Sequence, residues 1–216
     1  MPSLRILALG DSYTIGEGVA PEARWPERLA AALRAGAGSS PRSEGPDVAP
    51  PEIIAVTGWT IDDLGRGIDE AAPEGPFDLV TLLIGVNDQY DGRRWAELRD
   101  GYAARLAEAV ALAGGDASRV VCVSIPDWGV TPRGAADARG PHGIAAELDA
   151  LNAAERELAE AAGAAWVDIT PLSRGQGGAV VDDGLHPDAA AYAAWTERIV
   201  PAARRALGLD AEPAGG

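Results

Sequence analysis

The sequence predicts an α/β protein in which a five-stranded parallel sheet lies between two layers of helices. Five short apolar runs alternate with longer amphipathic stretches, and the runs are largely continuous rather than alternating. Strands that are buried on both faces have this pattern, and strand–helix alternation is typical of a parallel sheet with helices on both faces. The 216 residues suffice for one such domain with a proper core. We expect that domain over residues 1–208 and a flexible tail over 209–216.

The predicted elements follow in order along the chain. The strands are expected at the β-branched apolar runs Leu4–Leu9, Ile53–Val56, Leu79–Ile84, Val120–Ser124 and Ala165–Val167. The helices are expected at the amphipathic stretches Pro26–Ala35, Ile61–Ala71, Arg94–Ala113, Ile144–Ala162 and Ala189–Leu207. The segment Gly36–Pro51 is rich in Gly, Ser and Pro and has no period, so we expect a flexible surface loop there.

Composition excludes several classes of function. The formal net charge of -15 argues against binding to nucleic acid or to an anionic membrane surface. All 18 basic residues are arginine, which removes Schiff-base chemistry, P-loop phosphate binding and Ser-Lys dyads. The single cysteine, Cys122, lies in a buried-strand pattern and is expected to be an inert core thiol. With no Cys/His cluster there is no basis for a zinc site, and we expect neither a metal nor a cofactor.

Polar residues follow the end of each predicted strand. Because parallel strands end at the same edge of a sheet, these residues share one neighbourhood. The segments are Gly10-Asp11-Ser12, Thr57-Gly58-Trp59-Thr60, Gly85-Val86-Asn87-Asp88, Pro126-Asp127-Trp128-Gly129 and, beyond the last strand, Asp182-Asp183-Gly184-Leu185-His186-Pro187. Ser12, in a sharp turn bounded by glycines, is either a helix cap or a nucleophile.

A serine nucleophile needs a base, and the chain has two histidines. His142 lies in a polar segment that opens a helix, so we expect an exposed loop or cap residue. His186 has Asp183 three residues earlier, which could accept a hydrogen bond from Nδ1 and leave Nε2 free as base and later as acid. Asp182 could compete for this place, and the aspartates could instead only cap the last helix.

A tetrahedral oxyanion needs preorganised donors, and three strand ends offer one each. The N–H of Ser12 lies at the start of a helix or turn. Gly58 lacks a Cβ, so its N–H can approach a substrate closely. Asn87 offers a side-chain amide. Each residue alone would be better explained as a turn or cap; their joint occurrence favours a catalytic site. For Asp11 we expect a structural role, bonding backbone amides in the turn.

Four sequence blocks resemble those of the SGNH (GDSL-type) esterases and lipases. They are Gly10-Asp11-Ser12, Gly58, Gly85-x-Asn87-Asp88 and Asp183-x-x-His186, in the family's order and approximate spacing. The resemblance implies a flavodoxin-like three-layer fold, with Ser12 as nucleophile, His186 as base and Asp183 as its orienting residue. It also implies an oxyanion hole formed by Ser12 N–H, Gly58 N–H and the Asn87 side chain. The sequence departs from the family at Tyr13, where many members carry Leu, and this affects the expected shape of the pocket.

The resemblance leads to an expected activity: hydrolysis of small-acyl, acetyl-like carboxylic esters through an acyl-serine intermediate. Tyr13, Trp59, Tyr90 and Trp128 follow strand ends and are expected to wall the pocket, although Trp59 and Trp128 could equally close the rim of the core. No long apolar lid segment is present, which favours small acyl groups over long-chain lipid. The partner is therefore a small-molecule ester rather than nucleic acid or membrane. We see no secretory signal and expect a cytoplasmic protein.

Other functions remain as alternatives. One is a thioesterase or lysophospholipase-type hydrolase of the same family, and another is a flavodoxin-like binding module without catalysis. A phosphatase with Asp11 as nucleophile would need a second carboxylate two residues later, where this chain has Tyr13, and the usual lysine is also missing. The Gly-x-Ser-x-Gly elbow of the α/β-hydrolases is absent from the sequence.

Overall fold

A parallel five-stranded sheet forms the centre of the computed structural model, which describes residues 3–36 and 45–210. Its order is β2-β1-β3-β4-β5, and every neighbouring pair is parallel. The strands are β1 (Ile6–Gly10), β2 (Glu52–Ala55), β3 (Leu79–Leu83), β4 (Val120–Val123) and β5 (Ala165–Val167). The predicted parallel sheet is thus confirmed, with strand limits that differ from the expected ones by at most two residues.

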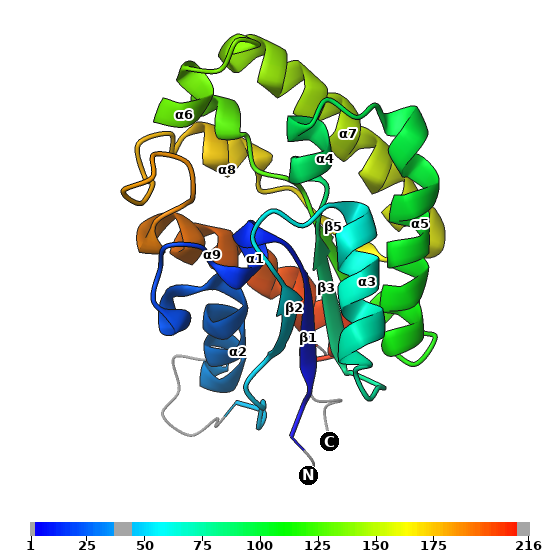
Figure 1. Cartoon of the computed structure of the whole chain (residues 1–216). Coiled ribbons are helices and arrows are strands. Elements are labelled where there is room, and N and C mark those ends of the chain that lie inside the picture. Colours follow the sequence, from blue (N-terminus) through cyan, green and yellow to red (C-terminus); the bar gives the residue numbers. More distant parts are fainter. Residues whose placement is uncertain (1–2, 37–44, 211–216) are drawn as a thin grey trace.

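Helices cover both faces of the sheet, so the fold has three layers (Figure 1). The long helices are α2 (Trp25–Ala35), α3 (Ile61–Ala71), α5 (Trp95–Leu112), α7 (Gly140–Ala162) and α9 (Ala189–Ala206). Helices α2 and α9 pack together on one face, whereas α5 packs against both α3 and α7 on the other. All five lie where the sequence predicts them, and α7 begins four residues earlier than expected.

Several short helical segments are additional to the prediction. They are α1 (Ser12–Ile15), α4 (Val86–Tyr90), α6 (Pro132–Ala135) and α8 (Thr170–Arg174), with the 3-10 turns η1 (Pro21–Ala23), η2 (Ala117–Arg119) and η3 (Trp128–Val130). Each is too short to display a hydrophobic period, which explains why the pattern of the sequence did not indicate them. Most follow strand ends, so they shape the edge of the sheet where the polar segments gather.

The strand ends are aligned by the register of the sheet. Gly10, the last residue of β1, pairs with Ala55 of β2 and with Leu83 of β3. The segments that begin at Asp11, Val56 and Ile84 therefore leave the sheet at one level. This alignment places Ser12, Gly58 and Asn87 at one edge, as the parallel topology requires.

Two segments differ from the expectation of flexibility. Part of the expected loop Gly36–Pro51 lies outside the described residues, but Val48 is buried and forms a parallel bridge with Leu4. Residues 211–216 of the expected tail also lie outside the described residues. Leu209, by contrast, packs against the core, and Asp210 pairs with Arg204 at 2.8 Å. Packing thus extends past residue 208. Of the helices that the structure describes, none has the length and apolarity needed to cross a membrane.

Candidate active site

The turn between β1 and α1 presents Ser12. A Cβ on Gly10 would lie 2.2 Å from Thr14 Oγ1 and 2.5 Å from the carbonyl oxygen of Leu83, so only glycine lets the chain turn this closely against β3. Ser12 is 4 % exposed, and its hydroxyl makes no hydrogen bond to a described residue. Its side chain borders a cleft that His186 also lines.

Asp11 stabilises the turn that carries Ser12. Its Oδ1 accepts the N–H of Tyr13 at 3.0 Å and so caps α1, which is the structural role expected of it. Complete burial raises the pKa of this carboxyl to about 7; the Tyr13 hydrogen bond opposes the shift, and the charge of Asp88 adds to it. Asp11 Oδ2 has no hydrogen-bond partner among the described residues, which fits a carboxyl that is easily protonated.

Asp11 makes folding stability depend on pH in an unusual direction. Because its pKa of about 7 exceeds the ordinary aspartate value of 3.8, the folded state binds more protons than the unfolded state between these values. Its contribution is therefore fully present below pH 4 and is lost as the pH rises towards 7. We expect Asp11→Asn to gain stability over wild type across this range, by up to about 1.4 kcal/mol per pH unit. Urea unfolding of both proteins at pH 4, 5.5 and 7 measures the difference; a gap that stays constant with pH would contradict the assignment.

His186 and Asp183 form a hydrogen-bonded pair in the turn before α9. His186 Nδ1 lies 2.6 Å from Asp183 Oδ2, while Asp183 Oδ1 accepts the N–H groups of Leu185 and His186 at 2.8 and 3.0 Å. Burial alone would raise the pKa of Asp183, but these hydrogen bonds outweigh it and lower the pKa. An ionised Asp183 fixes the imidazole so that Nε2 is the free nitrogen. Asp182 has no such contact, which identifies Asp183 as the partner of His186.

Three hydrogen-bond donors, two from the backbone and one from a side chain, lie at the same edge of the sheet as His186. The N–H groups of Ser12 and Gly58 have no acceptor among the described residues. Gly58 has φ +87, and a Cβ there would meet nothing within 4 Å, so this glycine borders open space. Asn87 Nδ2 donates one hydrogen bond to the carbonyl oxygen of Trp59 at 2.8 Å, which leaves its second N–H for the cleft.

Asp88 anchors the segment that carries Gly58, a role that the sequence did not indicate. Its Oδ2 accepts the N–H of Ile61 at 2.9 Å, and its Oδ1 pairs with Arg93 at 2.6 Å. Burial raises the pKa of Asp88, although the Ile61 N–H and the Arg93 guanidinium oppose this. With the Asn87–Trp59 hydrogen bond, these contacts tie the end of β2 to the end of β3 and fix the spacing between the Gly58 and Asn87 donors.

The cleft above Ser12 has two connected parts. The larger part has a volume of ≈ 350 Å³ and is lined by Ser12, Thr57, Gly58, Asn87, Tyr90, Arg133, Asp183, Leu185 and His186. The smaller part has a volume of ≈ 50 Å³ and is lined by Ser12, Tyr13, Val86, Asn87, Tyr90, Trp128, Arg133, Leu185 and His186. The structure thus brings together eight of the nine residues that the sequence nominated for the site.

Trp59 is the exception among the residues expected in the wall. Its ring packs over α3, where a Cβ on Gly67 would lie 2.1 Å from the indole, and the residue is not among those that line either part of the cleft. Only its carbonyl oxygen serves the site, as the acceptor for Asn87. Trp59 thus belongs to the packing of the rim, which is common for an amphipathic ring.

Arg139 holds the two aromatic residues of the far wall. Its guanidinium lies 5.5 Å from the ring centre of Tyr90 and 5.2 Å from that of Trp128. Trp128 Nε1 also donates to Gln89 Oε1 at 2.8 Å. The sequence did not predict the contacts of Arg139 and Gln89 with Trp128, because no regular spacing relates these residues to it.

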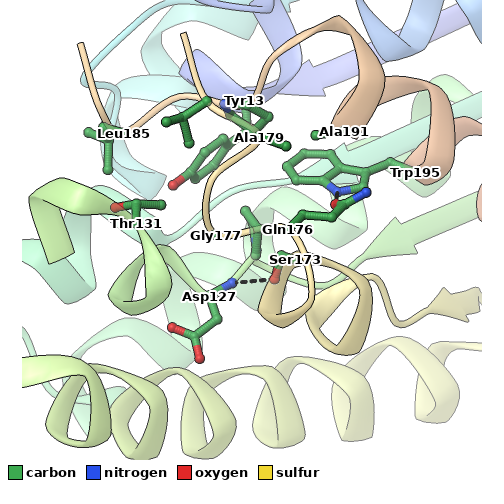
Figure 2. Close-up of a pocket in the computed structure, with 13 residues that line it drawn as sticks. Tyr13, Asp127, Thr131, Ser173, Gln176, Gly177, Ala179, Leu185, Ala191 and Trp195 are labelled. Carbon is green, nitrogen blue, oxygen red and sulfur yellow. Dashed lines mark hydrogen bonds between the residues drawn. The ribbon is translucent and has the colours of Figure 1, made fainter. Parts of the chain in front are cut away.

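Tyr13 lines a second pocket as well as the cleft, and Figure 2 shows it with the other residues of that pocket. This pocket has a volume of ≈ 20 Å³, enough for about one water molecule, and shares Tyr13 and Leu185 with the cleft. The Tyr13 ring contacts His186 edge-on, with ring centres 5.9 Å apart, and Trp195 at 6.0 Å. It thus lines the smaller part of the cleft beside His186.

Two reactive residue types lie away from the cleft. His142 is exposed in the first turn of α7, as expected. Cys122 is buried in β4, and burial raises the pKa of its thiol to about 12, which agrees with an inert core residue.

The chain is similar to known proteins over most of its length. The model of the GDSL-like lipase/acylhydrolase family matches residues 8–194. A comparison with curated proteins found no match. Similar solved structures include TesA, with a TM-score of 0.71, 21% identity and coverage of 94% of this chain and 99% of that one. The SGNH-hydrolase family esterase AlinE4 has a TM-score of 0.65, 20% identity and coverage of 96% and 98%. A variant of Axe2, an acetyl xylan esterase from Geobacillus stearothermophilus, has a TM-score of 0.61, 18% identity and coverage of 98% and 97%.

At these identities the solved structures establish the three-layer fold. The family model shows the family to which the sequence belongs. Its match runs from β1 into α9 and includes all the strand-end segments that form the cleft. The chain belongs to the GDSL-like lipase/acylhydrolase family, and it is a serine ester hydrolase of that family.

Proposed function

We propose that the protein hydrolyses small-acyl esters through an acyl-Ser12 intermediate. The observation that carries this proposal is the convergence on one cleft of Ser12, a hydrogen-bonded Asp183–His186 pair and three N–H donors without an acceptor among the described residues. These donors are the backbone N–H groups of Ser12 and Gly58 and the second N–H of the Asn87 amide. An isolated serine in a tight turn would need none of these partners. A binding module would need neither the oriented imidazole nor the donors around the serine.

In the proposed mechanism, Ser12 Oγ turns toward His186 Nε2, which takes its proton as Oγ attacks the ester carbonyl carbon. Asp183 keeps His186 in the tautomer that has Nε2 free and stabilises the imidazolium. The N–H groups of Ser12 and Gly58 and the second N–H of Asn87 donate to the oxyanion. The intermediate then collapses, the C–O bond to the alcohol breaks, and His186 gives the alcohol its proton. Water, activated by His186, hydrolyses the acyl-enzyme and releases the acid.

The size of the smaller part of the cleft supports a short acyl group. Its ≈ 50 Å³ lies between Tyr13, Val86, Trp128 and Leu185, while the larger part of ≈ 350 Å³ opens around Gly58 and Asp183. The acyl group would occupy the small apolar part, and the alcohol the larger one, beside the imidazole that protonates it. Tyr13 would then set the limit on acyl length, because it lines both the small part of the cleft and the second pocket.

We expect p-nitrophenyl acetate and butyrate to be hydrolysed faster than longer esters, and Tyr13→Ala to shift the preference towards longer chains. Removing the ring would open the small part of the cleft towards the second pocket, since Tyr13 lines both. The measurement is kcat/KM across p-nitrophenyl esters from acetate to palmitate. In the variant we expect a rise of about 10-fold for hexanoate over butyrate, because each of the two additional buried CH₂ groups contributes about 0.8 kcal/mol.

Tyr13→Phe is the matched control, since it keeps the ring and should keep the wild-type profile. An unchanged profile in Tyr13→Ala would remove Tyr13 as the limit on acyl length. Rates in wild type that rise from acetate to palmitate would instead favour a lysophospholipase-type hydrolase.

A further inference from the structure

We propose that Arg133 makes the cleft selective for esters whose alcohol part carries an anionic group, a carboxylate or a phosphate. This inference rests on the proposed function, because it assigns a partner to a substrate of the same cleft. Arg133 lies at the cleft, and its guanidinium pairs with no carboxylate in the part of the chain that the structure describes.

The backbone of Arg133 is fixed to the turn that carries His186. Arg133 N–H donates to the carbonyl oxygen of Gly184 at 3.0 Å, and a Cβ on Gly184 would lie 3.4 Å from Pro132. Thr131 caps the short helix α6 by accepting the N–H of Gly134 at 3.1 Å. From this anchored position Arg133 lines both parts of the cleft.

The guanidinium of Arg133 has no ion-pair partner within the described part of the chain. No carboxylate there lies within 4.0 Å of its guanidinium, and the side chain donates no hydrogen bond to those residues. Other described arginines also lack a carboxylate partner, but Arg133 is the one among them that lines the cleft. Arg139 and Arg174, at the same edge of the sheet, each pair with two carboxylates. The carboxylate that shares the cleft, Asp183, is already bonded to His186 and to two backbone N–H groups.

A planar guanidinium suits an oxyanion of fixed geometry. Arginine can donate two parallel hydrogen bonds to a carboxylate or a phosphate, and such charge-assisted bonds are stronger than neutral ones. The rest of the protein repels anions, with a net charge of -15, so an unpaired cation at the cleft gives an anionic substrate its favourable contact there.

The anionic group belongs to the alcohol rather than to the acyl chain. The small part of the cleft has Tyr13, Val86 and Trp128 as walls, and burying a charge among apolar side chains is costly. The larger part also contains Thr57 and Asp183 and has room for both the alcohol and water. An anion there stays partly hydrated and reaches Arg133 while the ester carbonyl lies over Ser12.

The test compares acetyl esters that differ in charge but share the phenol scaffold. The probes are 4-acetoxybenzoate and 4-acetoxyphenyl phosphate as anionic esters and 4-acetoxybenzamide as the neutral one, each rate being divided by that of its alkaline hydrolysis. In wild type we expect kcat/KM for at least one anionic ester to exceed that of the amide by about 10-fold, the size expected of one charge-assisted hydrogen bond. In Arg133→Gln this ratio should fall close to one.

Arg198→Gln is the matched control. Arg198 is exposed on α9, outside the residues that line the cleft, and no described carboxylate pairs with it. This variant removes the same charge from the protein and should keep the wild-type ratio. A wild-type ratio near one for both anionic esters, or a ratio that Arg133→Gln leaves unchanged, would overturn the inference. Failure of the proposed function looks different: Ser12→Ala would then still hydrolyse the neutral amide-bearing ester.

Discussion

Replacement of Ser12 by alanine should reduce ester hydrolysis by about 10³-fold or more while the fold stays intact. The substitution removes the attacking oxygen but keeps the N–H of residue 12, so the proposed oxyanion donors remain. Any residual rate would come from these donors acting on water. Because the Ser12 hydroxyl has no hydrogen bond to a described residue, its loss should hardly affect stability. Steady-state hydrolysis of p-nitrophenyl acetate, together with thermal unfolding, measures both effects.

Ser118→Ala is a suitable control for this experiment. Ser118 is exposed in η2, which precedes β4 and so lies at the opposite edge of the sheet from Ser12. The control should have the wild-type rate. Hydrolysis by Ser12→Ala at the wild-type rate would show that another group carries the reaction.

Asp183→Asn should lower kcat by about 10³- to 10⁴-fold, through the tautomer of His186 rather than through lost packing. In the wild type, Asp183 Oδ2 lies 2.6 Å from His186 Nδ1 and accepts its proton, while Oδ1 accepts two backbone N–H groups. In the variant the amide oxygen can keep the backbone bonds, but the amide NH₂ then faces Nδ1. A donor there makes Nδ1 the acceptor and puts the proton on Nε2, which can no longer take the proton of Ser12.

Asp182→Asn makes the same chemical change one residue away. Asp182 has no hydrogen bond to His186, so this variant should keep the wild-type kcat. The pH dependence of kcat gives a second readout, since the residual activity of Asp183→Asn should rise at high pH, where hydroxide can act without the base. Equal losses in the two variants, or none in Asp183→Asn, would contradict the role given to Asp183.

The order of the sheet elements could be predicted because strands and long helices leave strong patterns. The continuous run Leu79–Ile84 and the amphipathic stretch Ile61–Ala71 correspond to β3 and α3 almost residue for residue. Helix α3 also begins with a capping box between Thr60 and Asp63. The bridge between Leu4 and Val48 could not be foreseen, since one apolar residue in a Gly- and Pro-rich segment has no period.

The topology of the sheet predicts where the site residues lie. It does not predict which other side chains hold them in place. Ser12, Gly58 and Asn87 come directly after parallel strands, so the sheet itself brings them together. The supporting contacts, such as Arg139 over Tyr90 and Trp128, depend on side-chain directions that strand order does not specify. The packing of the Trp59 ring against α3 is a contact of the same kind.

Labelling with a fluorophosphonate probe tests the central claim most directly. The probe phosphonylates a serine only where a base activates it and donors hold the phosphoryl oxygen, so it reports the whole proposed site at once. We predict one adduct per chain, found by peptide mass spectrometry on Ser12 and absent from the Ser12→Ala protein. No adduct on the wild-type protein, or an adduct on a different residue, would contradict the assignment of Ser12 as the nucleophile.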